Sequence, residues 1–163
     1  MGSDPVFARA VVLDTNIVLD LFVFADAAAR TVRSRLEAGG LRWLATQAMR
    51  DELERVLAYP KIVPRLAFYK MAAADVLGAF DRHSECVDVP AKAPVTCKDP
   101  DDQKFIDLAV AHGALLLSKD RAVLALKKRL VVLSVEAGAT LSSSVLTNLK
   151  DRSARPAPSA STA

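Results

Sequence analysis

The stretch VVLDTNIVLDLF, residues 11–22, starts as an apolar run, places Asp14, Thr15 and Asn16 side by side, and then becomes apolar again. Residues 8–14 (ARAVVLD) are rich in β-branched side chains and uncharged between Arg9 and Asp14, which predicts a buried strand. A carboxylate directly after such a strand costs free energy unless a partner compensates its charge. Asp14 is therefore the first residue for which we expect a functional reason.

Outward from this stretch, strand-like apolar segments alternate with helical ones. Residues 16–37 suit one or two helices that stop at Gly39 and Gly40, and Thr46 is placed to cap a helix that Pro60 ends. We expect further strands at residues 41–45, 85–90, 114–118 and 130–135, and further helices at residues 46–59, 61–83, 102–113 and 119–126. This alternation predicts an α/β fold whose central, mostly parallel sheet is covered on both faces, although spacing does not give the strand order.

Length and composition suit a single domain with a real core, since the chain has 163 residues and 52% of them are hydrophobic. We expect an N-terminal extension at residues 1–8, the domain at residues 9–150 and a disordered tail at residues 151–163. Because no apolar run approaches the roughly 18 residues of a membrane helix and the N-terminus lacks a signal peptide, we expect a cytoplasmic protein without membrane contact. The net charge of +3 permits binding to a polyanion without demanding it, and Cys86 and Cys97 suit ordinary reduced thiols.

Acidic residues fall near the carboxyl ends of the expected strands. Asp14 ends the first strand, Asp120 lies two residues after the strand at 114–118, and Asp102 opens the helix before that strand. Glu52 lies in the helix that follows the strand at 41–45. Chemistry in a parallel α/β sheet gathers at this rim, so four separate segments can bring a carboxylate to one place.

Each acid also has an ordinary structural explanation. Asp14, Asp102 and Asp120 stand where helix N-caps are favoured, and Glu52 could pair with Arg55 or face water. Several carboxylates on one rim repel each other, however, and a divalent cation resolves that repulsion. An all-oxygen set without His or Cys suits Mg²⁺ or Mn²⁺, and a phosphodiester would complete the coordination with its own negative oxygens.

Four blocks of the sequence together resemble the PIN domain. They are VVLDTN, MRDELERVL, DPDDQKFIDLAVAHGA and LLLSKD, and their order and spacing match the family over about residues 9–140. More narrowly, they resemble the branch described as toxin components of toxin–antitoxin systems. The resemblance implies a three-layer, Rossmann-like α/β/α domain and Mg²⁺- or Mn²⁺-dependent hydrolysis of RNA, usually single-stranded.

The resemblance also implies roles for particular residues. Matched position by position, the metal-binding and catalytic acids are Asp14, Glu52, Asp102 and Asp120. Asn16 and Ser118 match polar positions that support these acids by hydrogen bonds, with Ser118 standing where Thr is more usual, and Thr15 helps to hold the turn. In the DPDD block we rank Asp99 and Asp101 below Asp102 because they lie farther out on the loop, and helical spacing turns Asp107 away from Asp102.

Partners follow from the same resemblance. It implies RNA as the substrate, an antitoxin protein that covers the acidic rim, and a homodimer. Basic residues beside the motif acids are candidates for the RNA backbone, and they are Arg50, Lys98, Lys104, Lys119 and Arg121.

Other functional classes fit the sequence less well. Haloacid dehalogenase-type phosphatases need a second Asp two residues after the nucleophile, and Asn16 stands there. Receiver domains need an acidic pair early in the chain, which Asp4 alone does not supply. The remaining alternative is a catalytically silent PIN fold that binds RNA or a protein.

Overall fold

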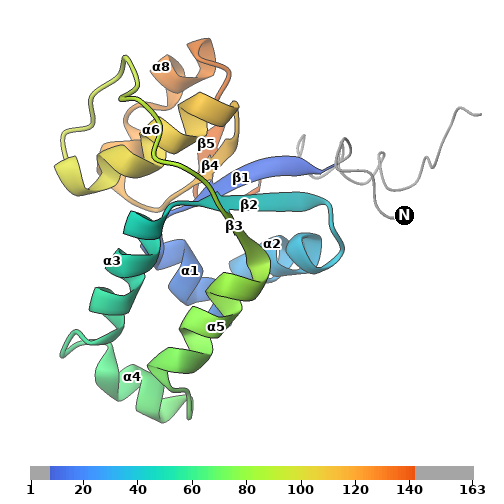
Figure 1. Ribbon diagram of the computed structural model, residues 1–163, viewed down its shortest axis with the longest axis vertical. Coiled ribbons are helices and arrows are strands. Elements are labelled where there is room, and N and C mark those ends of the chain that lie inside the picture. Colours follow the sequence, from blue (N-terminus) through green and yellow to red (C-terminus); the bar gives the residue numbers. More distant parts are fainter. Residues whose placement is uncertain (1–7, 142–163) are drawn as a thin grey trace, which may run out of the picture.

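The computed structural model describes residues 8–141, which form a parallel sheet between two layers of helices (Figure 1). The expected tail at 151–163 and all but Ala8 of the expected extension lie outside these residues. The sheet has five strands in the order β3-β2-β1-β4-β5, and every neighbouring pair is parallel. The strands are β1 (Arg9–Leu13), β2 (Leu41–Ala45), β3 (Ser84–Cys86), β4 (Leu115–Leu117) and β5 (Ala137–Gly138).

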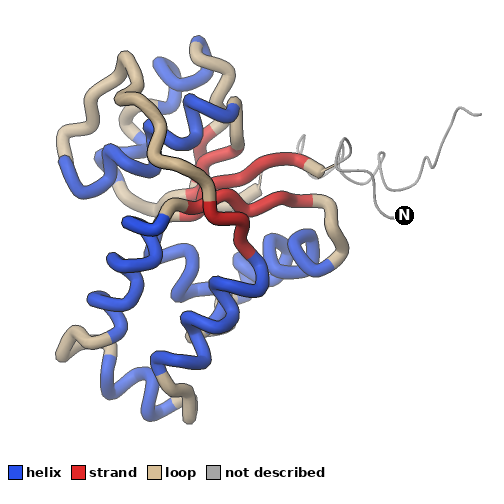
Figure 2. Tube along the Cα trace, viewed as in Figure 1, coloured by secondary structure: helices blue, strands red, loops and turns tan. Residues whose placement is uncertain are grey.

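Helices cover both faces of this sheet, as Figure 2 shows. On one side lie α1 (Thr15–Phe22), α2 (Ala27–Glu37), α3 (Gln47–Leu57), α4 (Val63–Phe68) and α5 (Ala73–His83). Against β1, β4 and β5 pack α6 (Gln103–His112), α7 (Arg121–Leu124) and α8 (Lys127–Val132). The predicted three-layer α/β/α class is therefore confirmed. Within residues 8–141, no helix combines the length and the apolar character needed to cross a membrane.

The strand order places a crevice between β1 and β4. From β1 the chain builds outward to β2 and β3, and it then crosses over to place β4 and β5 on the other side of β1. The connections therefore leave the carboxyl ends of β1 and β4 in opposite directions. Such a reversal opens a crevice at that point, where open α/β sheets bind their ligands.

The core explains why the strands carry so few polar side chains. Val11, Val12 and Leu116 are fully buried because helices cover both faces of the central strands. On one face the indole of Trp43 meets the ring of Phe80 edge-on, with ring centroids 4.8 Å apart. These contacts fix β2 against α5.

The prediction of a strand at 130–135 is wrong, because this segment forms the end of α8 and a turn. The edge strand β5 follows at Ala137–Gly138. Leu126 and Leu130 are buried at helical spacing, whereas Val131 and Val132 are 63% and 82% exposed. An apolar run of this length fits either periodicity, and here the helical one buries the leucines.

The expected helix at 61–83 is broken in two. Lys70 adopts a left-handed conformation with φ 56°, which separates α4 from α5. The apolar spacing of residues 61–83 predicts Leu66, Phe68 and Phe80 in the core. Leu66 and Phe80 are buried as expected, whereas Phe68 is 78% exposed. The strand expected at 85–90 is shorter and begins earlier, as β3.

The predicted cap of α3 is confirmed, and it suggests a test. The buried Thr46 hydroxyl accepts a hydrogen bond from the backbone N–H of Met49 (3.4 Å). We expect Thr46→Ala to lower the free energy of unfolding by about 1 kcal/mol, because it removes the acceptor from the first turn. Urea denaturation would measure this, with Thr46→Ser as the control that keeps the hydroxyl. Equal losses in both variants would contradict the capping role.

Candidate metal centre

Asp14 lies at the crevice, between the end of β1 and the start of α1. Its Oδ1 accepts from the backbone N–H of Ile17 (3.0 Å), and its Oδ2 accepts from the Ser118 hydroxyl (2.5 Å). Parallel pairing of Leu13 with Leu117 places the next residues of the two strands side by side. Sheet register therefore joins Asp14 and Ser118, although 104 residues separate them.

Ser118 joins two of the predicted acids. Its hydroxyl, which is fully buried, donates to Asp14 and accepts from the backbone N–H of Asp120 (3.0 Å). Asp120 in turn caps α7, with Oδ1 accepting from the N–H of Ala122 (2.8 Å). Capping thus uses Oδ1 of Asp120, and Oδ2 takes no part in the cap. The ordinary capping explanation and a metal-binding role are compatible at this position.

A second carboxylate group lies around Asp102. One oxygen each from Asp99, Asp102 and Asp120 lie within 4.8 Å of one another. Asp102 makes no side-chain cap on α6, and its Oδ2 is buried without a hydrogen-bond partner. Asp99, which we ranked below Asp102, folds back to cap the short 3₁₀ turn Pro100–Asp102. This turn brings Asp99 into the group.

Crowding of these carboxylates changes their protonation. Removal from water is the main cause that raises the pKa of Asp102 to about 7. The charge of Asp120, a hydrogen bond that protonated Asp102 shares with the Asp120 side chain, and the charges of Asp99 and Asp14 raise it further. Burial also raises the pKa of Asp14, although the Ser118 hydroxyl and the N–H of Ile17 oppose this. The ionised cluster is therefore under electrostatic strain that a cation would relieve.

Glu52 reaches the same place from α3. A cleft of about 250 Å³ is lined by all four predicted acids together with Thr15, Asn16, Leu19, Val56, Tyr59, Lys61, Ile62 and Phe105. Glu52 Oε1 lies 2.5 Å from the ammonium nitrogen of Lys104 in an ion pair whose angles do not make a hydrogen bond. The structure thus brings Asp14, Glu52, Asp102 and Asp120 together.

The donor set of this cleft fits a hard divalent cation. Its donors are carboxylate oxygens, with no His among the lining residues, and Oδ2 of Asp102 points at no protein donor. Mg²⁺ and Mn²⁺ prefer such ligands. The described residues could therefore hold a metal ion here, and we call this set the carboxylate cluster (Asp14, Glu52, Asp99, Asp102 and Asp120).

The expected supporting residues differ in what they contact. Ser118 supports Asp14 directly, whereas Thr15 and Asn16 line the cleft. Over residues 8–141 the Asn16 amide donates no hydrogen bond to a carboxylate.

Gln103 and Asp107, which we did not assign to the site from the sequence, hold the loop that leads into it. Gln103 accepts from the N–H of Cys97 (2.7 Å) and donates to the carbonyl of Val95 (2.9 Å). It also donates to Asp107 (2.8 Å), whose carboxylate accepts from the N–H of Ala93 as well. Asp107 indeed faces away from the cleft and orders the segment that leads into Asp99. The sequence signal for this role was the polar side chain of Gln103 directly after DPDD.

The basic residues proposed for RNA are mostly paired with acids. Arg50 forms an ion pair with Asp81 (2.7 Å), and Lys119 pairs with Asp20 (2.5 Å). Lys104 is paired with Glu52, while Lys98 and Arg121 are exposed. Asp20 was not anticipated, although a charge inside the apolar run of α1 was a visible signal.

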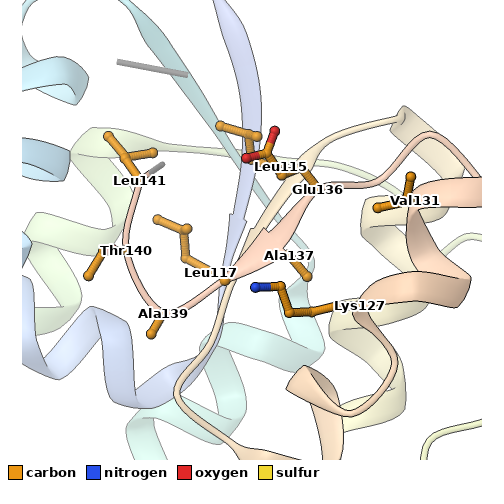
Figure 3. Close-up of a pocket in the computed structure, with 10 residues that line it drawn as sticks. Leu115, Leu117, Lys127, Val131, Glu136, Ala137, Ala139, Thr140 and Leu141 are labelled. Atoms are coloured by element: carbon orange, nitrogen blue, oxygen red, sulfur yellow. The ribbon is translucent and has the colours of Figure 1, made fainter. Parts of the chain in front are cut away.

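A further cavity, of about 260 Å³, lies beside β5 and carries no cluster of acids (Figure 3). Leu115, Leu117 and Leu141 line it together with Lys127 and Glu136. Its lining is mainly apolar, so it does not offer the ligands of a metal centre.

Comparison with models of known protein families gives a match. The model of a family described as PIN domain matches residues 10–122, a range that runs from β1 into α7 and contains the whole carboxylate cluster. No curated protein matched the chain.

Proposed function

The chain belongs to the PIN-domain family, and we propose that it is a divalent-metal-dependent ribonuclease that hydrolyses phosphodiester bonds of single-stranded RNA. PIN domains have a nuclease-like fold. The observation that carries the proposal is the carboxylate cluster at the β1/β4 crevice, in which Oδ2 of Asp102 is buried without a partner. Such a group is costly to keep in a fold unless a ligand uses it.

In this proposal Asp14, Asp102, Asp120 and Glu52 hold Mg²⁺ or Mn²⁺, and Asp99 adds a fifth carboxylate. When bound there, the cation supplies Lewis-acid stabilisation of the phosphodiester and activation of water. Ser118 keeps the Asp14 carboxylate in one orientation, which is the usual role of a hydrogen bond behind a metal ligand. Leu19 and Phe105 add buried apolar side chains to the lining of the cleft.

The reaction that we propose is an in-line displacement at phosphorus. The oxygen of water forms a bond to phosphorus, and the bond from phosphorus to the 3′ oxygen breaks. Water gives up one proton, the 3′ oxygen takes one up, and the other water proton stays on the new 5′ phosphate. The products carry a 5′ phosphate and a 3′ hydroxyl. Asp102 must be ionised to hold the cation, so activity should require a pH at which its carboxyl is deprotonated.

We further propose that the protein is a toxin component with a protein antitoxin, and that it forms a homodimer. The resemblance of the four sequence blocks to the toxin branch supports the toxin role. The acidic cleft is complementary to a basic side chain, so an antitoxin could block it by placing an Arg among the carboxylates.

Cleavage of a mixed-sequence single-stranded RNA tests the proposal. We expect cleavage with Mn²⁺ or Mg²⁺, loss of cleavage with EDTA, and a loss of at least about 1000-fold in Asp102→Asn. Asp101→Asn is the matched control, because its exposed side chain lies one residue away and outside the cleft lining. Cleavage that persists in EDTA or in Asp102→Asn would overturn the proposal. A folded, metal-loaded protein that cleaves nothing would favour a silent binding module.

A further inference from the structure

The segment that joins α3 to α5 exposes aromatic rings to solvent. Phe68 is 78% exposed, Tyr59 is 50% exposed and Tyr69 is 41% exposed. These are both tyrosines of the chain and one of its six phenylalanines, within residues 59–70. Phe68 meets Tyr69 edge-on, with ring centroids 5.1 Å apart, and its outer face remains open. We call residues 59–70 the α4 platform.

The same segment is positively charged. Lys61, Arg65 and Lys70 are exposed, and residues 58–72 contain no Asp or Glu. Over residues 8–141 none of these three side chains takes part in an ion pair. The guanidinium of Arg65 stacks over the ring of Phe24 at 3.9 Å, which fixes it on the surface.

The platform is continuous with the carboxylate cleft. Tyr59, Lys61 and Ile62 line the cleft beside the predicted acids. From there α4 extends to the end of the molecule farthest from the sheet (Figure 1). A ligand that leaves the cleft on this side meets Tyr59 and Lys61 first and the rings of α4 next.

A phosphodiester chain needs attraction outside the cleft, because the carboxylates repel its phosphates. Three of the basic residues that neighbour the motif acids in the sequence are paired with Asp81, Glu52 and Asp20 and so have less charge to offer. The platform supplies unpaired cations and exposed rings together. This is the combination with which proteins hold single strands, since cations follow the backbone and unpaired bases stack on aromatic side chains.

We propose that the α4 platform binds a single-stranded stretch of nucleic acid and guides it into the carboxylate cleft, an inference that rests on the proposed function. Stacking needs unpaired bases, so a duplex should bind poorly. A second copy of the chain suits this surface less well, because docking like platforms would bring Lys61, Arg65 and Lys70 against their own charges.

Fluorescence anisotropy with labelled oligonucleotides of about 12 nucleotides tests the platform. The probes are a single-stranded RNA, the DNA of the same sequence and the RNA duplex, and the full chain carries Asp102→Asn so that the RNA stays intact. We expect Phe68→Ala to weaken single-strand binding about 10-fold and Phe68→Trp to preserve it. The matched control is Val132→Ala, since Val132 is 82% exposed on α8. Relative binding of RNA and DNA shows which single strand is preferred.

The salt dependence of binding tests the charge of the platform. We expect the combined Lys61→Ala and Lys70→Ala variant to reduce the slope of log affinity against log salt by about 1.4, roughly 0.7 for each lost phosphate contact. An unchanged slope, or equal binding of single strand and duplex, would overturn the proposal.

Other outcomes separate the platform from the proposed function. If the parent protein cleaves RNA and Phe68→Ala binds single strands as tightly as its parent, the platform fails and the nuclease stands. If cleavage is absent but single-strand binding depends on Phe68, the platform stands and the nuclease fails. If Phe68→Ala converts a dimer to a monomer in sedimentation and leaves RNA affinity unchanged, the platform is an interface between copies and the proposal is wrong.

Discussion

Replacing Asp102 with asparagine is expected to stabilise the metal-free protein at pH 8 and to abolish its stabilisation by Mn²⁺. In the folded protein the pKa of Asp102 is raised from 3.8 to about 7 because the carboxyl is removed from water and faces other carboxylates. At pH 8 the folded state must therefore hold an unfavourable charge. Asparagine has nearly the same shape and carries no charge, so it removes this cost.

The sign of the effect follows from linkage. The folded-state pKa lies above the unfolded one, so a proton on Asp102 stabilises the fold below pH about 4, and this contribution is lost as the pH rises to about 7. For a fully shielded carboxyl the change would be ~4 kcal/mol. Asp102 is only partly buried and water screens its neighbours, so we expect an advantage for Asp102→Asn of about 1–2 kcal/mol at pH 8 and much less near pH 4.

Metal should reverse this order of stability. A cation at 100 times its dissociation constant stabilises a folded protein by about 2.7 kcal/mol, and the parent protein should gain this while Asp102→Asn should not. Thermal unfolding at pH 8, with EDTA and with Mn²⁺, measures both effects. Asp101→Asn is the matched control and should follow the parent under both conditions. A variant that is less stable than the parent in EDTA would show that the Asp102 charge carries no cost in the fold, and a variant that responds to Mn²⁺ as the parent does would show that Asp102 is not a ligand.

The convergence of the acids could be predicted because it depends on local rules. Asp14 and Asp120 follow recognisable strands, Asp102 opens a recognisable helix, and Glu52 lies in the helix that follows β2. Parallel strands bring such positions to one rim. The PIN-domain family itself was also predicted from the motifs and is confirmed.

What the sequence could not supply depends on contacts between distant residues. The β1–β4 pairing that joins Asp14 to Ser118 follows from strand order, and spacing carries no information about strand order. The place of Asp99 depends on a 3₁₀ turn, which a loop sequence does not reveal. Arg50 forms its ion pair with Asp81 of α5, and Lys119 forms its ion pair with Asp20 of α1. Both partners are distant in the sequence.

Local ambiguity accounts for the remaining errors. LVVLSV satisfies the periodicity of a strand and of a helix, and only the burial of Leu130 against the sheet decides between them. Phe68 fitted a helical core pattern, but the segment divides at the left-handed residue Lys70 into α4 and α5, and Phe68 of α4 faces solvent. The error at Phe68 is informative, because a large apolar residue that packing does not explain is where a binding surface is to be sought.

Ser118→Ala is expected to weaken Mn²⁺ binding by about 10- to 100-fold although Ser118 is not itself a proposed ligand. Its hydroxyl is the side-chain donor to Oδ2 of Asp14 and the acceptor for the backbone N–H of Asp120. Alanine leaves the buried Asp14 carboxylate and the partly buried N–H of Asp120 without this partner, which should also cost about 1–3 kcal/mol of stability. Ser118→Thr keeps the hydroxyl and should bind Mn²⁺ nearly as the parent does.

The pH dependence separates a positioning role from a general loss of stability. The Ser118 hydrogen bond lowers the pKa of Asp14, while burial raises it, so losing the bond should raise that pKa further. Protons should then compete with Mn²⁺ up to a higher pH in Ser118→Ala than in the parent or in Ser118→Thr. Calorimetric titration with Mn²⁺ at several pH values, on folded protein at low temperature, measures this shift. If the affinity and its pH profile are unchanged in Ser118→Ala, the hydroxyl only packs the crevice, and Asp14 needs no help to hold a metal ion.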